Sequence, residues 1–326
     1  MRVRNLIASV VAAASLALAP VTARAYSAFY LFGDSLSDAG NLYLATGTPA
    51  SPPYYFGEFS NGPIWAQYLS VLGFGLGPVL PSLVGGNDYA WGGATTGYPA
   101  TGSSPPPTLA DQVGAYIAGL GPGSAPPTAL YSVWIGANDI FTILKSGVTF
   151  PTAVQYAQGA AGAEAQEIQA LALKGAKHFL VPLVPNLGVT PGITSEGPIV
   201  AAAATRLSQV YNATLRADLA PLVGAPGLRL SYLDVYALLD EVVADPGVFG
   251  FTNGTDACYV GPYTGGGSVC ADPNDYVFWD QVHPTTAAGL IVAEAAFGAV
   301  PEPRALLVFA TALAALAVTR RAPRAS

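Results

Sequence analysis

The sequence is poor in charged residues, above all in basic ones. Only 10% of its 326 residues are charged, although 52% are hydrophobic. Residues 26–300 hold six basic residues against nineteen acidic ones, which gives this region a net charge of −13. Nucleic acids and anionic membrane surfaces repel such a region, so we expect neither as a partner. The hydrophobic fraction is sufficient for the core of one large domain.

Side chains that bind metals are also scarce. The chain has two histidines and two cysteines, and no second cysteine or histidine lies close enough in sequence to Cys258 and Cys270 to complete a zinc set. The two cysteines fall in a loop-like stretch of a chain that we expect to be exported, where oxidation is the common fate. We therefore predict a disulfide between them. We expect no metal and no organic cofactor.

A Gly-x-Ser-x-Gly motif is absent. Ser35 has Gly33 two residues before it, but Ser37 occupies the position of the second glycine. This absence argues against the nucleophile elbow of the α/β-hydrolases.

The N-terminus has the features of a secretory signal. Basic residues near the start precede an apolar stretch over 6–18 and a small-residue site at 23–25. We predict that residues 1–25 are a signal peptide and that the mature chain begins at Tyr26.

The C-terminus has a different pattern. The tripeptide 301–303 (Pro-Glu-Pro) precedes an apolar run over 305–318 and a basic tail. This run would span roughly 21 Å as a helix, whereas a hydrocarbon core is roughly 30 Å thick. Residues 301–326 resemble the PEP-CTERM sorting signal of Gram-negative bacteria, which implies an exosortase-type processing enzyme as partner. The alternative is a tail anchor in the inner membrane. Both place the domain outside the cytoplasm, either secreted, on the cell surface or in the extracellular matrix.

Four near-continuously apolar runs predict strands that are covered on both faces. They are Phe29–Phe32, Leu130–Ile135, His178–Leu183 and Leu228–Leu233. Helical stretches alternate with them, which predicts an α/β domain with a mainly parallel sheet and helices on both sides. The predicted helices are Ile64–Leu72, Leu109–Leu120, Ala153–Lys174, Ala201–Leu219 and Thr285–Phe297. Active sites of such folds gather at the carboxyl ends of the strands.

Polar residues stand at those strand ends. Ser35 follows the first strand and Asn138 follows the second. His283 lies near the end of the domain, three residues after Asp280. A serine hydroxyl is a weak nucleophile unless a histidine, oriented by a carboxylate, takes its proton. These residue types therefore indicate hydrolytic chemistry.

Four blocks occur in the order known from one enzyme family. They are 33–41 (GDSLSDAGN), 88–96 (DYAWGGATT), 135–139 (IGAND) and 280–284 (DQVHP). On these blocks the sequence over 26–300 resembles the GDSL or SGNH hydrolases. The resemblance implies a three-layer α/β/α sandwich of the SGNH hydrolase-like, flavodoxin-like type. It implies Ser35 as nucleophile, His283 as base and Asp280 as the acid that orients it.

The same resemblance implies an oxyanion hole. Its donors would be the backbone N–H groups of Ser35 and Gly93 and the side-chain amide of Asn138. The second block departs from the family, because Asp88 stands where asparagine is usual. Either Gly92 or Gly93 could therefore be the donor.

Structural roles for these residues are the alternatives. Ser35 and Asn138 could cap helices, and the glycine pair could simply form a turn. Asp34 is expected to fix the turn around Ser35, as is Asp38. His178 is expected to be a surface residue without a catalytic role.

The function implied is that of an exported, serine-dependent esterase or lipase that acts through an acyl-enzyme. Its substrate would be a lipid, a small ester or an acylated polysaccharide. Three alternatives stay open at this point: an acyltransferase, an exopolysaccharide deacetylase, and a non-catalytic matrix-binding protein with the same fold. The aromatic residues 54–56 could line a substrate site.

Overall fold

The computed structural model describes residues 26–98 and 106–300. A four-stranded parallel sheet lies at its centre, with the strands in the order β1-β2-β3-β4. These strands are β1 (Phe29–Gly33), β2 (Leu130–Trp134), β3 (His178–Pro182) and β4 (Arg229–Leu233). All four predicted strands are confirmed, each to within one residue at its ends.

A further segment extends the sheet beyond β1. Leu31 donates its N–H to Asn87 O at 3.1 Å and accepts the Tyr89 N–H at 2.8 Å. The Trp91 N–H donates to Gly33 O at 3.1 Å. The second sequence block therefore lies along the strand that leads into the first.

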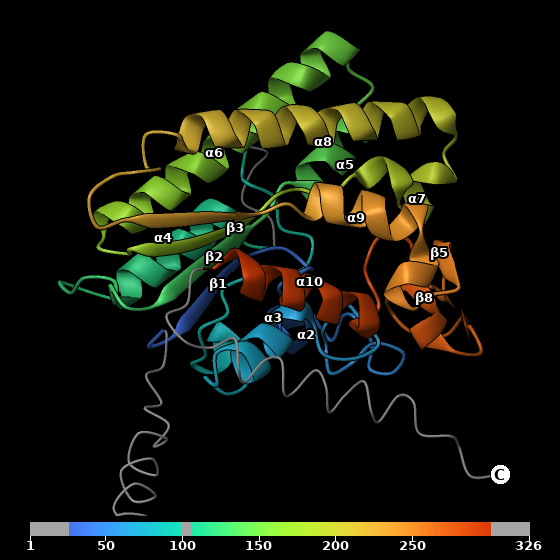
Figure 1. Ribbon diagram of the computed structural model, residues 1–326, viewed down its shortest axis with the longest axis horizontal. Helices are drawn as coiled ribbons and strands as arrows, with labels where there is room; N and C mark the ends of the chain where they lie inside the picture. The colour runs from blue at the N-terminus through green and yellow to red at the C-terminus, as the bar shows by residue number, and fades with distance from the viewer. Residues whose placement is uncertain (1–25, 99–105, 301–326) are drawn as a thin grey trace, which may run out of the picture.

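Helices cover both faces of the sheet (Figure 1). One layer holds α4 (Leu109–Gly119), α5 (Ala137–Lys145), α6 (Phe150–Leu173) and α8 (Pro198–Leu219). The opposite layer holds α3 (Trp65–Tyr68), its π-helical continuation Leu69–Gly73, and α10 (Thr286–Ala299). The predicted three-layer α/β/α fold is confirmed.

Strand β2 shows why the sheet is covered on both sides. All five of its residues are buried. Tyr131 and Val133 belong to the core under α6 and α8, whereas Leu130 and Trp134 belong to the core under α10. Alternate side chains of a strand point to opposite faces, so an apolar run serves two cores at once.

The five predicted helices are present, and α6 begins three residues earlier than predicted. Pro151 lies in its first turn, where the missing N–H of proline removes no helical hydrogen bond. The helix that Asn138 was considered to cap is α5, which begins at Ala137, and three other helices were not predicted. These are α2 (Asn41–Thr46), α7 (Pro191–Thr194) and α9 (Val235–Ala244). All except α9 are shorter than ten residues, which leaves little periodicity to detect.

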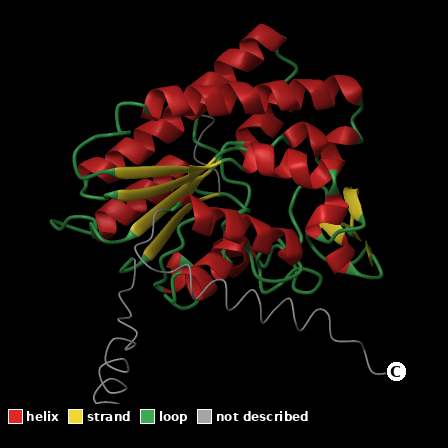
Figure 2. Ribbon diagram, viewed as in Figure 1, coloured by secondary structure: helices red, strands yellow, loops and turns green. Residues whose placement is uncertain are grey.

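The rest of the domain consists of short elements, shown in yellow at the right of Figure 2. Strands β5 (Asn253–Ala257) and β8 (Tyr276–Phe278) pair in parallel, and β6 (Tyr259–Val260) pairs with β7 (Ser268–Val269) as a hairpin. Short 3₁₀ turns connect the elements. They are Ser82–Val84, Leu187–Val189, Pro246–Phe249 and Pro273–Asp275.

The predicted disulfide is confirmed. Cys258 and Cys270 are bonded, with their Cα atoms 4.8 Å apart, and they close the base of the β6–β7 hairpin. Within 26–98 and 106–300, no helix has the length and apolar character needed to cross a membrane. The predicted signal peptide and sorting signal lie outside the described residues.

Candidate active site

Ser35 lies in a tight turn directly after β1. Asp34 holds this turn, because its Oδ1 accepts the Leu36 N–H at 3.0 Å and its carbonyl accepts the Ser37 N–H at 3.0 Å. A side chain at Gly33 would collide with the carbonyl of Trp134, so only glycine fits before the turn. The expected structural role of Asp34 is confirmed.

The structure brings the two distant sequence blocks together. Ser35 Oγ lies 2.7 Å from His283 Nε2, although the residues are 248 positions apart. His283 Nδ1 lies 2.8 Å from Asp280 Oδ2. The three residues are 8%, 4% and 3% exposed, respectively. A serine, an imidazole and a carboxylate are therefore joined in one hydrogen-bonded chain.

The surroundings of Asp280 favour its ionised form. Burial alone raises the pKa of this carboxyl group, but His283 and two backbone N–H groups offset that effect and lower its pKa below the ordinary value. The two N–H donors are those of Val282 at 2.9 Å and His283 at 2.8 Å. An ionised carboxylate beside the imidazole can stabilise its protonated form.

A fourth residue supports the carboxylate. The Tyr54 hydroxyl donates to Asp280 Oδ2 at 2.7 Å, and Tyr54 is only 2% exposed. The suggestion that Tyr54 lines a substrate site is therefore wrong, because its side chain points into the protein. No local sequence pattern indicates this contact, since 226 positions separate the two residues.

Two aromatic rings border the histidine. The Phe59 ring lies 4.9 Å from the His283 ring and the Tyr263 ring lies 6.0 Å from it, measured between centroids. Tyr263 comes from the loop of the disulfide-closed hairpin. These contacts limit the orientations that the imidazole can adopt.

The structure separates the two candidate glycines. The Gly92 N–H donates to Asp38 Oδ2 at 2.7 Å, so this N–H is already engaged. Among the described residues, no acceptor takes the N–H of Gly93 or that of Ser35. Gly93 has a φ of +78°, a conformation that glycine adopts without strain. Gly93 is therefore the glycine with a donor available beside Ser35.

Asn138 lies in the first turn of α5. Its Nδ2 donates to Ala94 O at 3.0 Å, which uses one of its two side-chain hydrogens and leaves the other available. Gly136 precedes this helix with a φ of +111°, and a side chain there would meet the Tyr211 ring. Asn138 is therefore fixed on a rigid helix beside Gly93.

Buried carboxylates connect the sequence blocks. Asp88 accepts the Ala39 N–H at 2.7 Å, and Asp139 accepts the Thr96 hydroxyl at 2.6 Å. Burial raises the pKa of Asp38 to about 6 and that of Asp139 to about 6. Asp38 accepts the N–H groups of Gly40 at 2.8 Å and Asn41 at 2.6 Å, so its local hydrogen bonds lie at the start of α2. Together these carboxylates join the nucleophile turn, the glycine pair and α5 in one hydrogen-bonded unit.

An open cleft connects these groups. Ser35, His283, Gly93 and Asn138 all line a space of about 1950 Å³, part of which is open to solvent. His178 lies at the amino end of β3, far from this cleft, where its ring packs on Tyr26. His178 is partly exposed and takes no part in the site, in agreement with the expectation.

The model of the family described as GDSL-like lipase/acylhydrolase matches residues 29–296. The chain belongs to this family. It is a GDSL-family ester hydrolase. The match covers nearly the whole described domain, including all four sequence blocks.

Curated relatives come from bacteria and plants. The chain is 28% identical to a phosphatidylcholine-sterol acyltransferase of Aeromonas hydrophila, with 83% of this chain and 89% of that protein covered. It is 32% identical to the esterase EstA of Pseudomonas aeruginosa, over 89% of this chain and 49% of EstA. The chain thus spans about half the length of EstA. A GDSL esterase/lipase of Arabidopsis thaliana is 27% identical, with 83% and 86% covered.

Solved structures with distant sequences are also similar. The acetylxylan esterase Axe2 of Geobacillus stearothermophilus is 15% identical with a TM-score of 0.43, over 84% of this chain and 96% of that chain. Phospholipase A1 of Streptomyces albidoflavus is 14% identical with a TM-score of 0.42, over 84% and 98%.

Proposed function

We propose that the protein hydrolyses carboxylic esters through an acyl-enzyme formed on Ser35. The observation that carries this proposal is the hydrogen-bonded chain from Ser35 Oγ through His283 to Asp280, with distances of 2.7 and 2.8 Å. In this chain the imidazole can remove the hydroxyl proton while the carboxylate stabilises the resulting positive charge.

In the first step, Ser35 Oγ attacks the ester carbonyl carbon and its proton passes to His283 Nε2. The carbonyl oxygen becomes negative and is stabilised by fixed donors. These donors are the N–H groups of Ser35 and Gly93 and the second side-chain hydrogen of Asn138. Their availability in the structure supports this assignment.

In the second step, the tetrahedral intermediate collapses. His283 gives its proton to the leaving alkoxide, the alcohol departs, and the acyl group remains on Ser35 as an ester. A water molecule then attacks this ester while His283 takes one of its protons. Release of the carboxylic acid returns the proton to Ser35. The residues described are sufficient for each proton transfer.

The test uses Ser35→Ala, His283→Ala and Asn138→Ala with a chromogenic short-chain ester. The first two variants should remove nearly all hydrolysis while the circular dichroism spectrum stays unchanged. The third should lower kcat on the order of a hundredfold or more. Full turnover by the Ser35 variant would refute the mechanism. Failure of the folded protein to react with a fluorophosphonate probe would favour a non-catalytic binding protein instead.

Acyl transfer to an alcohol is the second candidate function. The similarity to an acyltransferase over 83% of the chain favours it. The same acyl-enzyme would form, and an acceptor alcohol would replace water in the deacylation step. Product analysis with a phospholipid donor and an added alcohol distinguishes the two, because a dominant transfer product identifies an acyltransferase.

We place this activity outside the cytoplasm. The disulfide supports that location, since such bonds persist in oxidising compartments. The predicted signal peptide and the proposed sorting signal over 301–326 agree with export and with processing by an exosortase. Cell fractionation and mass spectrometry of the mature ends would test both. A protein found in the cytoplasm with both termini intact would contradict export and processing.

A further inference from the structure

The turn over 280–283, which carries the catalytic carboxylate and imidazole, contacts the segment that follows β3. This segment spans residues 183–194 and ends in α7. The Gly192 N–H of α7 donates to Gln281 O at 2.8 Å. Because Gln281 lies between Asp280 and His283 in the sequence, this backbone hydrogen bond acts directly on the catalytic turn. Neither Gly192 nor the rest of α7 takes part in the proton transfers.

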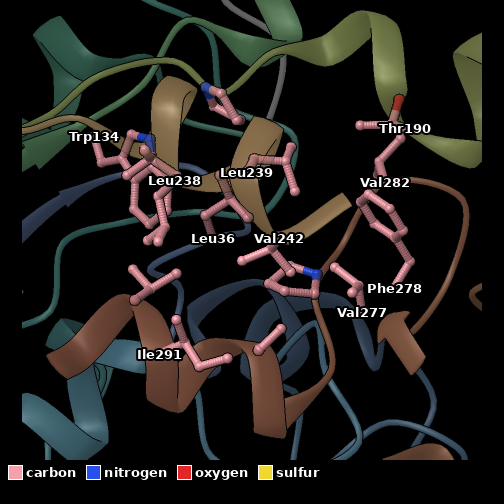
Figure 3. Close-up of a pocket in the computed structure, with 15 residues that line it drawn as sticks. Leu36, Trp134, Thr190, Leu238, Leu239, Val242, Val277, Phe278, Val282 and Ile291 are labelled. Carbon is pink, nitrogen blue, oxygen red and sulfur yellow. The ribbon is translucent and has the colours of Figure 1, made fainter. Parts of the chain in front are cut away.

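The contact between α7 and the turn is close. A Cβ atom added at Gly192 would lie 3.2 Å from both Gln281 Cβ and Gln281 O, which is closer than ordinary van der Waals contact. It would also lie 3.7 Å from Val282 Cγ1. Val282 and Thr190, which precedes α7, both line an apolar pocket between α9 and α10 (Figure 3). Only glycine therefore lets the backbone of α7 approach the turn without displacing it.

Asn186 fixes this segment to two helices. Its Nδ2 donates to Asp240 Oδ1 of α9 at 2.7 Å, and its Oδ1 accepts the Thr205 hydroxyl of α8 at 2.8 Å. The same Oδ1 accepts the Gly188 N–H at 3.1 Å, within the segment. Asn186 is only 5% exposed, so these hydrogen bonds are shielded from water and are costly to lose. One side chain therefore determines where the segment lies relative to α8 and α9.

Helix α8 holds the segment at two further points. Asn212 accepts the Val184 N–H at 2.9 Å and donates to Val184 O at 2.8 Å. An added side chain at Gly188 would overlap Thr205 Oγ1 and the Ala201 carbonyl, so the backbone of the segment lies directly on the helix. A displacement of the segment would therefore break several buried hydrogen bonds at once. Such a rigid support can hold the catalytic turn in place.

We propose that Asn186 and Gly192 are positioning residues for His283. Asn186 fixes the segment to α8 and α9, and Gly192 holds the catalytic turn against it. This inference rests on the proposed acyl-enzyme mechanism, in which His283 Nε2 must stay within hydrogen-bonding distance of Ser35 Oγ, 2.7 Å away. A displacement of about 1 Å at a reacting group can cost on the order of a hundredfold in rate. The Asp280 side chain holds the turn from within, and the segment supports it from outside.

The first test exchanges the partners of the shortest Asn186 contact. Asn186→Asp places a carboxylate against that of Asp240 and should displace the segment, which should lower kcat roughly tenfold or more and change KM little. The double variant Asn186→Asp/Asp240→Asn exchanges donor and acceptor and keeps all three hydrogen bonds, so kcat should return to within about threefold of the parent value. A chromogenic short-chain ester measures both. Labelling by a fluorophosphonate probe, which needs the same activated Ser35, should slow by the same factor as kcat.

A merely structural role predicts a different result. Circular dichroism and the Tm identify the variants that are folded at the assay temperature. If Asn186 only stabilises the fold, the folded Asn186→Asp enzyme has a lower Tm but the kcat of the parent, which would overturn the proposal for Asn186. A loss of kcat that Asp240→Asn does not reverse would also overturn it, because the exchanged pair keeps the support.

The second test acts at the turn itself. Gly192→Ala removes no hydrogen-bonding group but pushes against Gln281, so kcat should fall roughly tenfold with little change in KM. Gly114→Ala, at an open position of α4, adds the same methyl group and is the matched control that should keep the parent kcat. Full kcat in Gly192→Ala would overturn the role of Gly192. If Asn186→Asp does not fold, Gly192→Ala still decides whether the segment positions the turn.

The outcomes separate the two proposals. If Ser35→Ala abolishes hydrolysis but the folded Asn186→Asp and Gly192→Ala variants keep the parent kcat, the positioning proposal is wrong and the mechanism stands. If Ser35→Ala retains hydrolysis, the mechanism itself is wrong.

Discussion

The hydroxyl of Tyr54 should control how strongly Asp280 supports the imidazole. It donates to Asp280 Oδ2 at 2.7 Å. Burial, and then the negative charge of Asp280, raise the pKa of Tyr54 far above the working range, so the hydroxyl remains a donor throughout. Tyr54→Phe removes only this hydroxyl. The ring contacts with Tyr259 at 5.5 Å and Trp279 at 6.2 Å need not change.

Two magnitudes follow from this geometry. A hydrogen bond to a charged acceptor contributes about 1.5–3 kcal/mol to the free energy of unfolding, so the variant should lose roughly 3–12 °C in Tm. Without the hydroxyl, the charge on Asp280 is shared with fewer donors and attracts the positive charge that forms at the site during catalysis more strongly. The acid limb of kcat/KM should therefore move to higher pH, by on the order of half a pH unit.

The measurement is a pH profile of kcat/KM with a chromogenic ester, together with calorimetry. Tyr116→Phe is the matched control, because the buried Tyr116 hydroxyl bonds to Tyr131 at 3.0 Å far from the cleft. The control should lose stability and keep the original pH profile. An unchanged profile for Tyr54→Phe would refute the idea that this hydroxyl tunes the carboxylate.

Three more predictions concern stability and the oxyanion donors. Gly92→Ala should cost about 1–3 kcal/mol of stability in chemical denaturation because its side chain would overlap a phenylalanine ring. Gly93→Ala should also lose stability, because its φ of +78° strains any side chain, and it should in addition lower kcat on the order of a hundredfold; a kcat no lower than that of Gly92→Ala would contradict this. Replacing Cys258 and Cys270 together by serine should cost up to roughly 3 kcal/mol in the same assay, and no change would mean that the hairpin needs no covalent closure. Burial raises the pKa of Asp34 from 3.8 to about 7, so its folded state binds a proton more tightly than the unfolded chain and stability should fall as pH rises from about 4 to about 7. Calorimetry should show this fall and a weaker one in Asp34→Asn; an equal fall in both would exclude Asp34 as the cause.

Much of the fold followed from the sequence because its strands are buried on both faces. A run such as 130–134 is apolar at every position except Ser132, and few other elements of that length share this pattern. Helix α5 was expected only as a helix that Asn138 could cap, without its bounds, because it has nine residues and follows β2 after only two. Helix α9 follows β4 after a single residue, Asp234, so no loop-like segment separates the helix from the strand.

The sequence by itself determined the chemical types at the site. A serine after the first strand, an asparagine after the second and an Asp-x-x-His pair near the end of the domain were each readable, because local turns and strand ends position them.

The tertiary structure decided everything that depends on partners distant in sequence. Asp38 engages Gly92 and leaves Gly93 available, Tyr54 reaches Asp280 across 226 positions, and the apolar pocket forms only where α9 meets α10. The physical reason is that hydrogen bonds and cavities depend on distances in space, which local periodicity does not encode.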